Sequence, residues 1–139
     1  MPAWTCPDCA RQFGRAKQSH MCSPGLTVEE YFSTGPAHER PIFDAVMAHM
    51  RTVGPVHVEP VQVGIFLKRA RTFAELRPKD RWVALTFSLD HEARHRTIVR
   101  KVMPYSGRYF HAANIASPDD IDDDIRTWLT EAYLASDPA

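Results

Sequence analysis

The chain has 139 residues, of which 44% are hydrophobic and 24% are charged, and its formal net charge at pH 7 is zero. This length fits one ordinary domain, with or without a small appended module, and excludes two large domains. No stretch approaches the roughly 20 consecutive apolar residues of a membrane-spanning helix. The N-terminus has neither a basic leader nor an apolar run, so we expect a cytoplasmic protein.

The charges are unevenly distributed along the sequence. Residues 68–111 hold eleven Lys or Arg and four Asp or Glu, whereas residues 112–139 hold one Arg and seven acids. The basic segment could bind an anionic partner such as nucleic acid, or the acidic tail could fold against it and neutralise it. The sequence leaves both alternatives open.

All three cysteines lie near the N-terminus, which favours metal binding in a reducing compartment over a disulfide framework. Cys6-x2-Cys9 is followed by His20-x-Cys22, which together supply the four ligands of a closed tetrahedral Cys₃His site. A redox-active CxxC pair is the alternative, but it would not need His20 and Cys22. We therefore predict a structural zinc finger at residues 1–25, with no open position for a catalytic water.

Two helices are predicted at the start of the main domain, which we place at residues 26–139. Thr27 and Glu30 have the spacing of a capping box, which predicts a short helix after Thr27. From His38 onward, apolar residues recur three and four positions apart until Gly54 ends the pattern. The members of this stripe are Ile42, Phe43, Val46, Met47, Met50 and Val53.

Strands are predicted next, because the hydrophobic period changes to two and β-branched and aromatic residues become frequent. The predicted segments are residues 56–67, 72–76, 82–89, 97–103 and 108–115. Their short connections favour antiparallel neighbours in a meander. In the third segment Val83, Leu85, Phe87 and Leu89 fall on one face, which we expect to be core.

A last helix is predicted from Ser117, an N-cap residue followed by Pro118 and several aspartates that the helix dipole favours. These aspartates lack the spacing of a calcium loop, so we expect a solvated helix start. The expected buried stripe is Ile121, Ile125, Trp128, Leu129, Ala132 and Tyr133. The predicted fold class is therefore α+β, with a zinc finger, a helix, a four- to five-stranded antiparallel meander and a C-terminal helix.

Residues 91–95 read HEARH, which matches the HExxH pattern of zinc metalloproteases. That chemistry needs a helix that places both histidines on one face beside the glutamate base. Residues 90–96 are instead a short, highly charged joint between two predicted strands, without an apolar stripe. We therefore predict an exposed polar hairpin loop here and no peptidase.

Three groups of residues carry a family resemblance. They are W-T-C-P-x-C with Phe13, Gln18, His20 and Cys22, the segment from Thr27 to Phe32, and Tyr109-Phe110-His111 with Ser117 to Tyr133. In these features the chain resembles an uncharacterised bacterial domain family, in which some relatives carry the label "predicted transport protein" and members can have a small N-terminal zinc finger. The resemblance implies no particular activity. The transport label finds no support, because the sequence has no membrane segment.

The functional prediction is a non-catalytic, zinc-binding interaction module whose basic middle segment recognises an anionic partner such as nucleic acid. A protein partner is an equal alternative. The candidate ligand-binding residues are Lys68, Arg69, Arg71, Arg100, Lys101, Arg108 and His111. The other alternative is a small enzyme with a polar pocket around His111 on an open sheet face, although that histidine could simply be structural. No recognised catalytic motif accompanies it, so we assign no catalytic residue.

Overall fold

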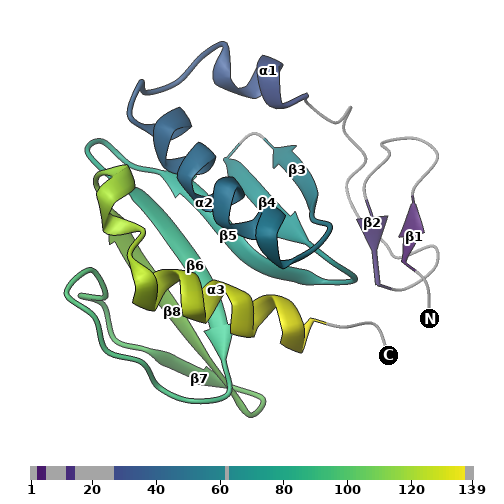
Figure 1. Cartoon of the computed structure of the whole chain (residues 1–139), viewed down its shortest axis with the longest axis vertical. Coiled ribbons are helices and arrows are strands. Elements are labelled where there is room, and N and C mark those ends of the chain that lie inside the picture. The colour runs from purple at the N-terminus through teal and green to yellow at the C-terminus, as the bar shows by residue number, and fades with distance from the viewer. Residues whose placement is uncertain (1–2, 6–11, 15–26, 62, 137–139) are drawn as a thin grey trace.

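The computed structural model describes residues 3–5, 12–14, 27–61 and 63–136 (Figure 1). The predicted zinc ligands Cys6, Cys9, His20 and Cys22 lie outside the described residues.

The described part of the main domain is built from helices packed on one antiparallel sheet. The helices are α1 (Val28–Phe32), α2 (Glu39–Val53) and α3 (Asp123–Ala135), with the 3-10 turn η1 (Pro118–Asp120) before α3. The strands of the main sheet are β3 (His57–Val61), β4 (Gly64–Lys68), β5 (Thr72–Pro78), β6 (Val83–Leu89), β7 (Met103–Tyr105) and β8 (Arg108–Ile115), in the spatial order β3-β4-β5-β6-β8-β7. A separate antiparallel pair consists of β1 (Trp4–Thr5) and β2 (Gln12–Phe13).

The predicted α+β fold is confirmed, with six strands in the main sheet where four or five were expected. Residues 56–67, expected as one strand, contain all of β3 and most of β4, which pair antiparallel as neighbours. The predicted strand at 97–103 is wrong, because residues 90–102 have no regular structure and β7 begins only at Met103. The Thr97 carbonyl accepts a single hydrogen bond from the Asn114 amide there, in place of a ladder.

The residues predicted to begin the helices are found at helix starts in the structure, with one change of position before α3. Thr27 and Glu30 form the capping box of α1, with both reciprocal hydrogen bonds present. Ser117 caps η1 instead of the long helix, and the Asp122 side chain caps α3 by accepting from the Ile125 amide at 3.1 Å. The chain therefore makes two successive caps, because Ile121 leaves the helical conformation between them (φ −82°, ψ 76°).

The core lies between the sheet and the helices α2 and α3, which both cross the same face of the sheet (Figure 1). The sheet contributes the buried side chains of Ile65, Leu67, Ala74, Leu76, Val83, Leu85, Phe87, Leu89, Ala113 and Ile115. The helices contribute Ile42, Val46, Met50, Ile125 and Leu129 among others. Each large apolar side chain buried in this way stabilises the fold by about 1.5 to 3 kcal/mol. The opposite face carries intermediate or exposed side chains at Thr86, Ser88, Phe110 and Ala112.

The close approach of β4 and β5 generates a stability prediction at Gly64. A Cβ atom there would lie 2.4 Å from the main-chain carbonyl oxygen of Leu76, which cannot move aside. We expect Gly64→Ala to lower the free energy of unfolding by about 1 to 3 kcal/mol, as measured by urea denaturation. Gly14→Ala is the control, because its nearest neighbours would lie at 3.7 Å. Equal stability of the two variants would contradict this packing.

Candidate functional site

The turn between β4 and β5 begins at Lys68, a predicted ligand-binding residue that the structure uses internally. Lys68 is only 8% exposed. Its Nζ lies 2.6 Å from Glu59 Oε2 and donates a hydrogen bond to the Gln12 carbonyl at 2.6 Å. A buried ammonium needs such partners, because an unpaired charge is costly away from water. Lys68 therefore ties β4 to β3 and to the β1–β2 pair.

Two arginines in the same turn contact the end of α3. The Arg69 guanidinium lies 4.5 Å from the centre of the Tyr133 ring and donates to the Tyr133 carbonyl at 3.5 Å. Arg71 donates to the Ala135 carbonyl at 3.4 Å. The last carbonyls of a helix have no partner within the helix, and positive charge is favourable at this end of the dipole. Both arginines therefore help to hold the end of α3 against the sheet.

Arg71 also lines a hollow of about 240 Å³, together with Arg108 from β8. The other lining residues in the part of the chain that the structure describes are Thr72, Phe73, Ser88, Phe110, Ala132, Ala135 and Ser136, and none of these is acidic. Arg108 is held in place by the Ser88 carbonyl at 2.8 Å and by Ser88 Oγ at 3.3 Å. A guanidinium has five N–H donors, so these contacts leave donors for a ligand. This hollow combines two positive charges with hydroxyl groups.

The remaining basic candidates lie elsewhere. Arg100 and Lys101 are exposed in the irregular segment before β7 and do not line this hollow. A second hollow, of about 290 Å³, shares Arg108 but is also lined by Asp90 and Glu131, so its charge is mixed. The structure thus brings two of the predicted ligand-binding residues, Arg71 and Arg108, into one concave site.

His111 does not lie on an open sheet face, so that expectation is wrong. Its side chain is 1% exposed and its ring stacks on Phe87, with the ring centres 5.3 Å apart. The Ala93 amide donates to His111 Nε2 at 2.9 Å, so this nitrogen acts as an acceptor and the ring is neutral. Burial accordingly lowers the pKa of His111 below its usual value. His111 thus fastens the loop after β6 to β8 on the covered face.

The HEARH segment has no helix, and its two histidines contact different acids. His91 Nε2 lies 2.9 Å from Glu131, and His95 Nε2 lies 2.8 Å from Asp122, both from the α3 region. The hydrogen bond with Glu131 raises the pKa of His91. The segment is less exposed than predicted, because Ala93 is buried and the His95 side chain is only 5% exposed. The segment is partly buried because it packs against α3 through these two histidines.

One group of possible metal ligands occurs among the described residues. Ligand atoms of His95, Asp122 and Asp124 lie within 4.8 Å of one another. Hydrogen bonds account for this arrangement, because Asp122 accepts from the Ile125 amide and from His95, whose Nδ1 contacts Thr97 Oγ1 at 2.7 Å. The positive end of the α3 dipole also disfavours a cation there. We therefore assign this group a structural role.

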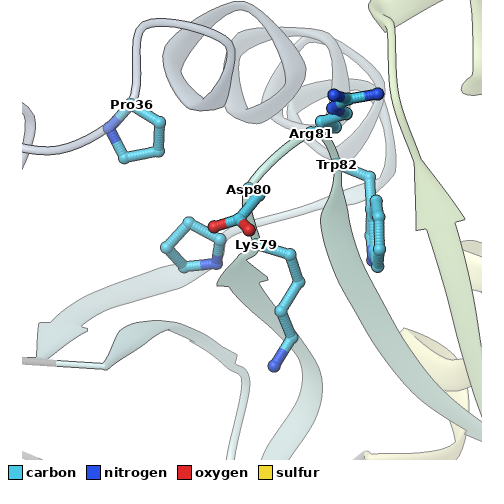
Figure 2. Close-up of a pocket in the computed structure, with 6 residues that line it drawn as sticks. Pro36, Lys79, Asp80, Arg81 and Trp82 are labelled. Atoms are coloured by element: carbon cyan, nitrogen blue, oxygen red, sulfur yellow. The ribbon is translucent and has the colours of Figure 1, made fainter.

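A wider groove of about 830 Å³ lies at the turn between β5 and β6 (Figure 2). It is lined by Pro36, Pro78, Lys79, Asp80, Arg81 and Trp82. Figure 2 shows the charged ends of Lys79, Asp80 and Arg81 pointing in different directions. Charges that diverge and include a carboxylate do not make an anion site, so this groove is a weaker candidate than the hollow at Arg71 and Arg108.

Sequence reasoning missed the residues that complete the hollow. Ser88 positions Arg108, and Phe110 adds an aromatic wall. The alternation in β6 did place Ser88 on the face away from the core, but nothing in the sequence pairs it with Arg108. That pairing follows from the register of β6 and β8, in which Ser88 lies opposite Phe110.

Comparison with known proteins gives one family match. A family model described as "Domain of unknown function (DUF5655)" matches residues 28–136. No curated protein and no solved structure matches the chain. The matched segment runs from the start of α1 to the residue after α3, so it includes the whole main sheet. Among the described residues, no helix is long and apolar enough to cross a membrane.

The buried neutral His111 predicts loss of stability in acid. Its pKa is lower in the folded chain than the usual 6.5, so the unfolded chain takes up the proton first. The contribution of neutral His111 to the free energy of unfolding should therefore be fully present above about pH 6.5 and decrease as the pH drops below that value. We expect His111→Gln to lose less stability than wild type between pH 7.5 and pH 5.5 in urea denaturation.

His49 and His57 also have pKa values lowered by burial, so the variant should keep part of this dependence. A pH dependence identical to that of wild type would show that His111 is not held neutral by the fold.

Proposed function

The chain belongs to the DUF5655 family of domains of unknown function, and we propose that it is a non-catalytic binding module that holds a phosphate-bearing partner at Arg71 and Arg108. The observation that carries this proposal is that two guanidinium groups, one from the turn before β5 and one from β8, line one hollow in which none of the described lining residues is acidic. Guanidinium groups suit phosphate because their planar N–H groups can form paired hydrogen bonds with two oxygens.

The size and lining of the hollow indicate what it accepts. At about 240 Å³ it lies below the roughly 300 to 1,000 Å³ of sites that enclose a drug-sized ligand. It therefore suits one anionic group of a larger partner. Thr72 and Ser88 offer hydroxyl donors beside the arginines, and Ser88 already orients Arg108. A phosphate of a nucleic acid meets these requirements, and a phosphorylated protein is the alternative partner.

An enzyme centred on His111 is less well supported. His111 lines none of the hollows described above, and its Nε2 is occupied by the Ala93 amide. Through Nε2 the buried ring holds the loop after β6 against β8, which supports a structural role.

We also propose that residues 1–25 bind a structural zinc ion through Cys6, Cys9, His20 and Cys22. Support comes from the antiparallel pairing of β1 with β2, in which Trp4 lies opposite Phe13. The stretch of sequence that connects these two strands contains both cysteines of the CxxC pair. Two thiolates so close in sequence can chelate one ion, and a segment this short needs the ion to hold it together.

The anion site predicts a specific loss of binding in Arg108→Ala. A hydrogen bond to a charged group contributes about 1.5 to 3 kcal/mol, so we expect affinity for tripolyphosphate to fall about tenfold or more in isothermal titration calorimetry. Arg81→Ala removes the same charge at the opposite end of the sheet and should change little. Equal losses in both variants, or no binding by wild type, would refute the site.

The zinc proposal predicts metal content. Elemental analysis of protein purified without added metal should find one zinc per chain in wild type and a loss in Cys9→Ser, because a site with one thiolate missing binds zinc weakly. The double variant His91→Ala/His95→Ala should keep its zinc. If the histidine pair removes the zinc and Cys9→Ser retains it, the metal site is the HEARH segment and the proposed finger is wrong.

A further inference from the structure

We propose that the β7–β8 hairpin is a platform on which unpaired bases stack, so that the partner of this domain is single-stranded nucleic acid. The inference rests on the proposed anion site, since Arg108 and Phe110 belong to both surfaces. It goes beyond that site by naming the class of partner and the side chains that would recognise it.

The hairpin exposes large apolar side chains that the fold itself does not use. Met103 is 59% exposed, Tyr105 is 73% exposed and Phe110 is 40% exposed. The Tyr105 and Phe110 rings meet edge to face, with their centres 6.4 Å apart. A contiguous group of exposed apolar residues commonly marks a binding surface. Two aromatic rings in particular offer faces on which nucleic-acid bases can stack.

The strand register places these residues on one face, next to the arginine site. Met103 lies opposite Phe110, and Tyr105 lies opposite Arg108. Phe110 lies opposite Ser88, the residue that holds Arg108. His111, the next residue, is buried in the core, so Phe110 lies on the other face of β8, the face that also carries Ser88 and Arg108. A phosphate at Arg108 would therefore have aromatic rings within reach of its neighbouring base.

The turn of the hairpin is suited to hold this arrangement. Ser106 (φ 52°) and Gly107 (φ 78°) form a two-residue connection in which both residues have positive φ, as in a type I′ turn. Such turns match the twist of paired strands and keep the two flanking residues directly opposite each other. Tyr105 and Arg108 are these flanking residues, so their relative position is set before any ligand binds.

Charge favours nucleic acid over an apolar protein surface as the occupant. The segment from 97 to 112 contains Arg100, Lys101 and Arg108 and no acidic residue. Alternating basic and aromatic side chains suit a strand of phosphates and bases. Single-stranded nucleic acid is favoured over a duplex, because paired bases are stacked on one another and do not present their faces.

The test compares binding of a fluorescently labelled oligonucleotide of twelve thymidines by wild type, Phe110→Ser and Tyr105→Ser. Loss of one base–aromatic stack corresponds to about a fivefold to 150-fold loss of affinity, so we expect about tenfold for each variant. The matched control is Val99→Ser, which removes another exposed apolar side chain, 70% exposed, from the segment before the hairpin. Its affinity should stay within about twofold of wild type. Urea denaturation of each variant checks that the fold is intact.

Salt dependence separates the stacking rings from the phosphate site. The slope of log affinity against log salt should be unchanged in Phe110→Ser and Tyr105→Ser and shallower in Arg108→Ala. If tripolyphosphate binding needs Arg108 but the oligonucleotide binds equally well to Phe110→Ser and Tyr105→Ser, the platform is refuted while the anion site stands. Equal affinity for a duplex of the same length would likewise overturn it. If neither ligand binds, both proposals fail.

Discussion

The buried charge of Lys68 is the interaction on which the arrangement of the chain depends. Its ammonium reaches Glu59 on the neighbouring strand and a carbonyl of β2, so one side chain joins three segments. Removing one partner of a buried ion pair costs about 3 to 5 kcal/mol, because the other charge is left unpaired. The hydrogen bond from Lys68 to the Gln12 carbonyl therefore links the β1–β2 pair to the end of β4, whose neighbour β3 supplies the balancing charge of Glu59.

The same turn contacts the C-terminal end of α3. Arg69 and Arg71 lie one and three residues after Lys68 and reach the last carbonyls of the helix, so residues 68–71 contact both the β1–β2 pair and α3. The hollow at Arg71 lies between that helix end and the sheet. The shape of the hollow therefore depends on how the end of α3 packs against the sheet. In the proposed function, the side chains that contact the ligand would already be in position before it binds.

The sequence predicted those features that depend on neighbouring residues. The capping box at Thr27 and the alternation from Val83 to Leu89 are local, and both are found in the structure. Buried polar contacts are not local. Lys68 lies 56 residues from Gln12, and His111 lies 18 residues from Ala93. Neither periodicity nor composition distinguishes such side chains from solvated ones, so the sequence placed Lys68 among the ligand-binding candidates and left His111 open between a ligand-binding and a structural role.

Two parts of the basic segment differ in whether their side chains contact acidic residues. Residues 91–96 contact the acidic region around α3, through His91 with Glu131, His95 with Asp122 and Arg96 with Asp120. The segment from 97 to 112 contains no acid, and its Arg108 lies opposite the exposed Tyr105. Charged contacts thus form where the loop packs on α3, whereas at the β7–β8 hairpin Arg108 shares one hollow with Asp90 and Glu131 and another with Arg71. The hollow that Arg108 shares with Arg71, next to the exposed rings of the hairpin, is therefore a stronger candidate for an anionic partner than residues 91–96.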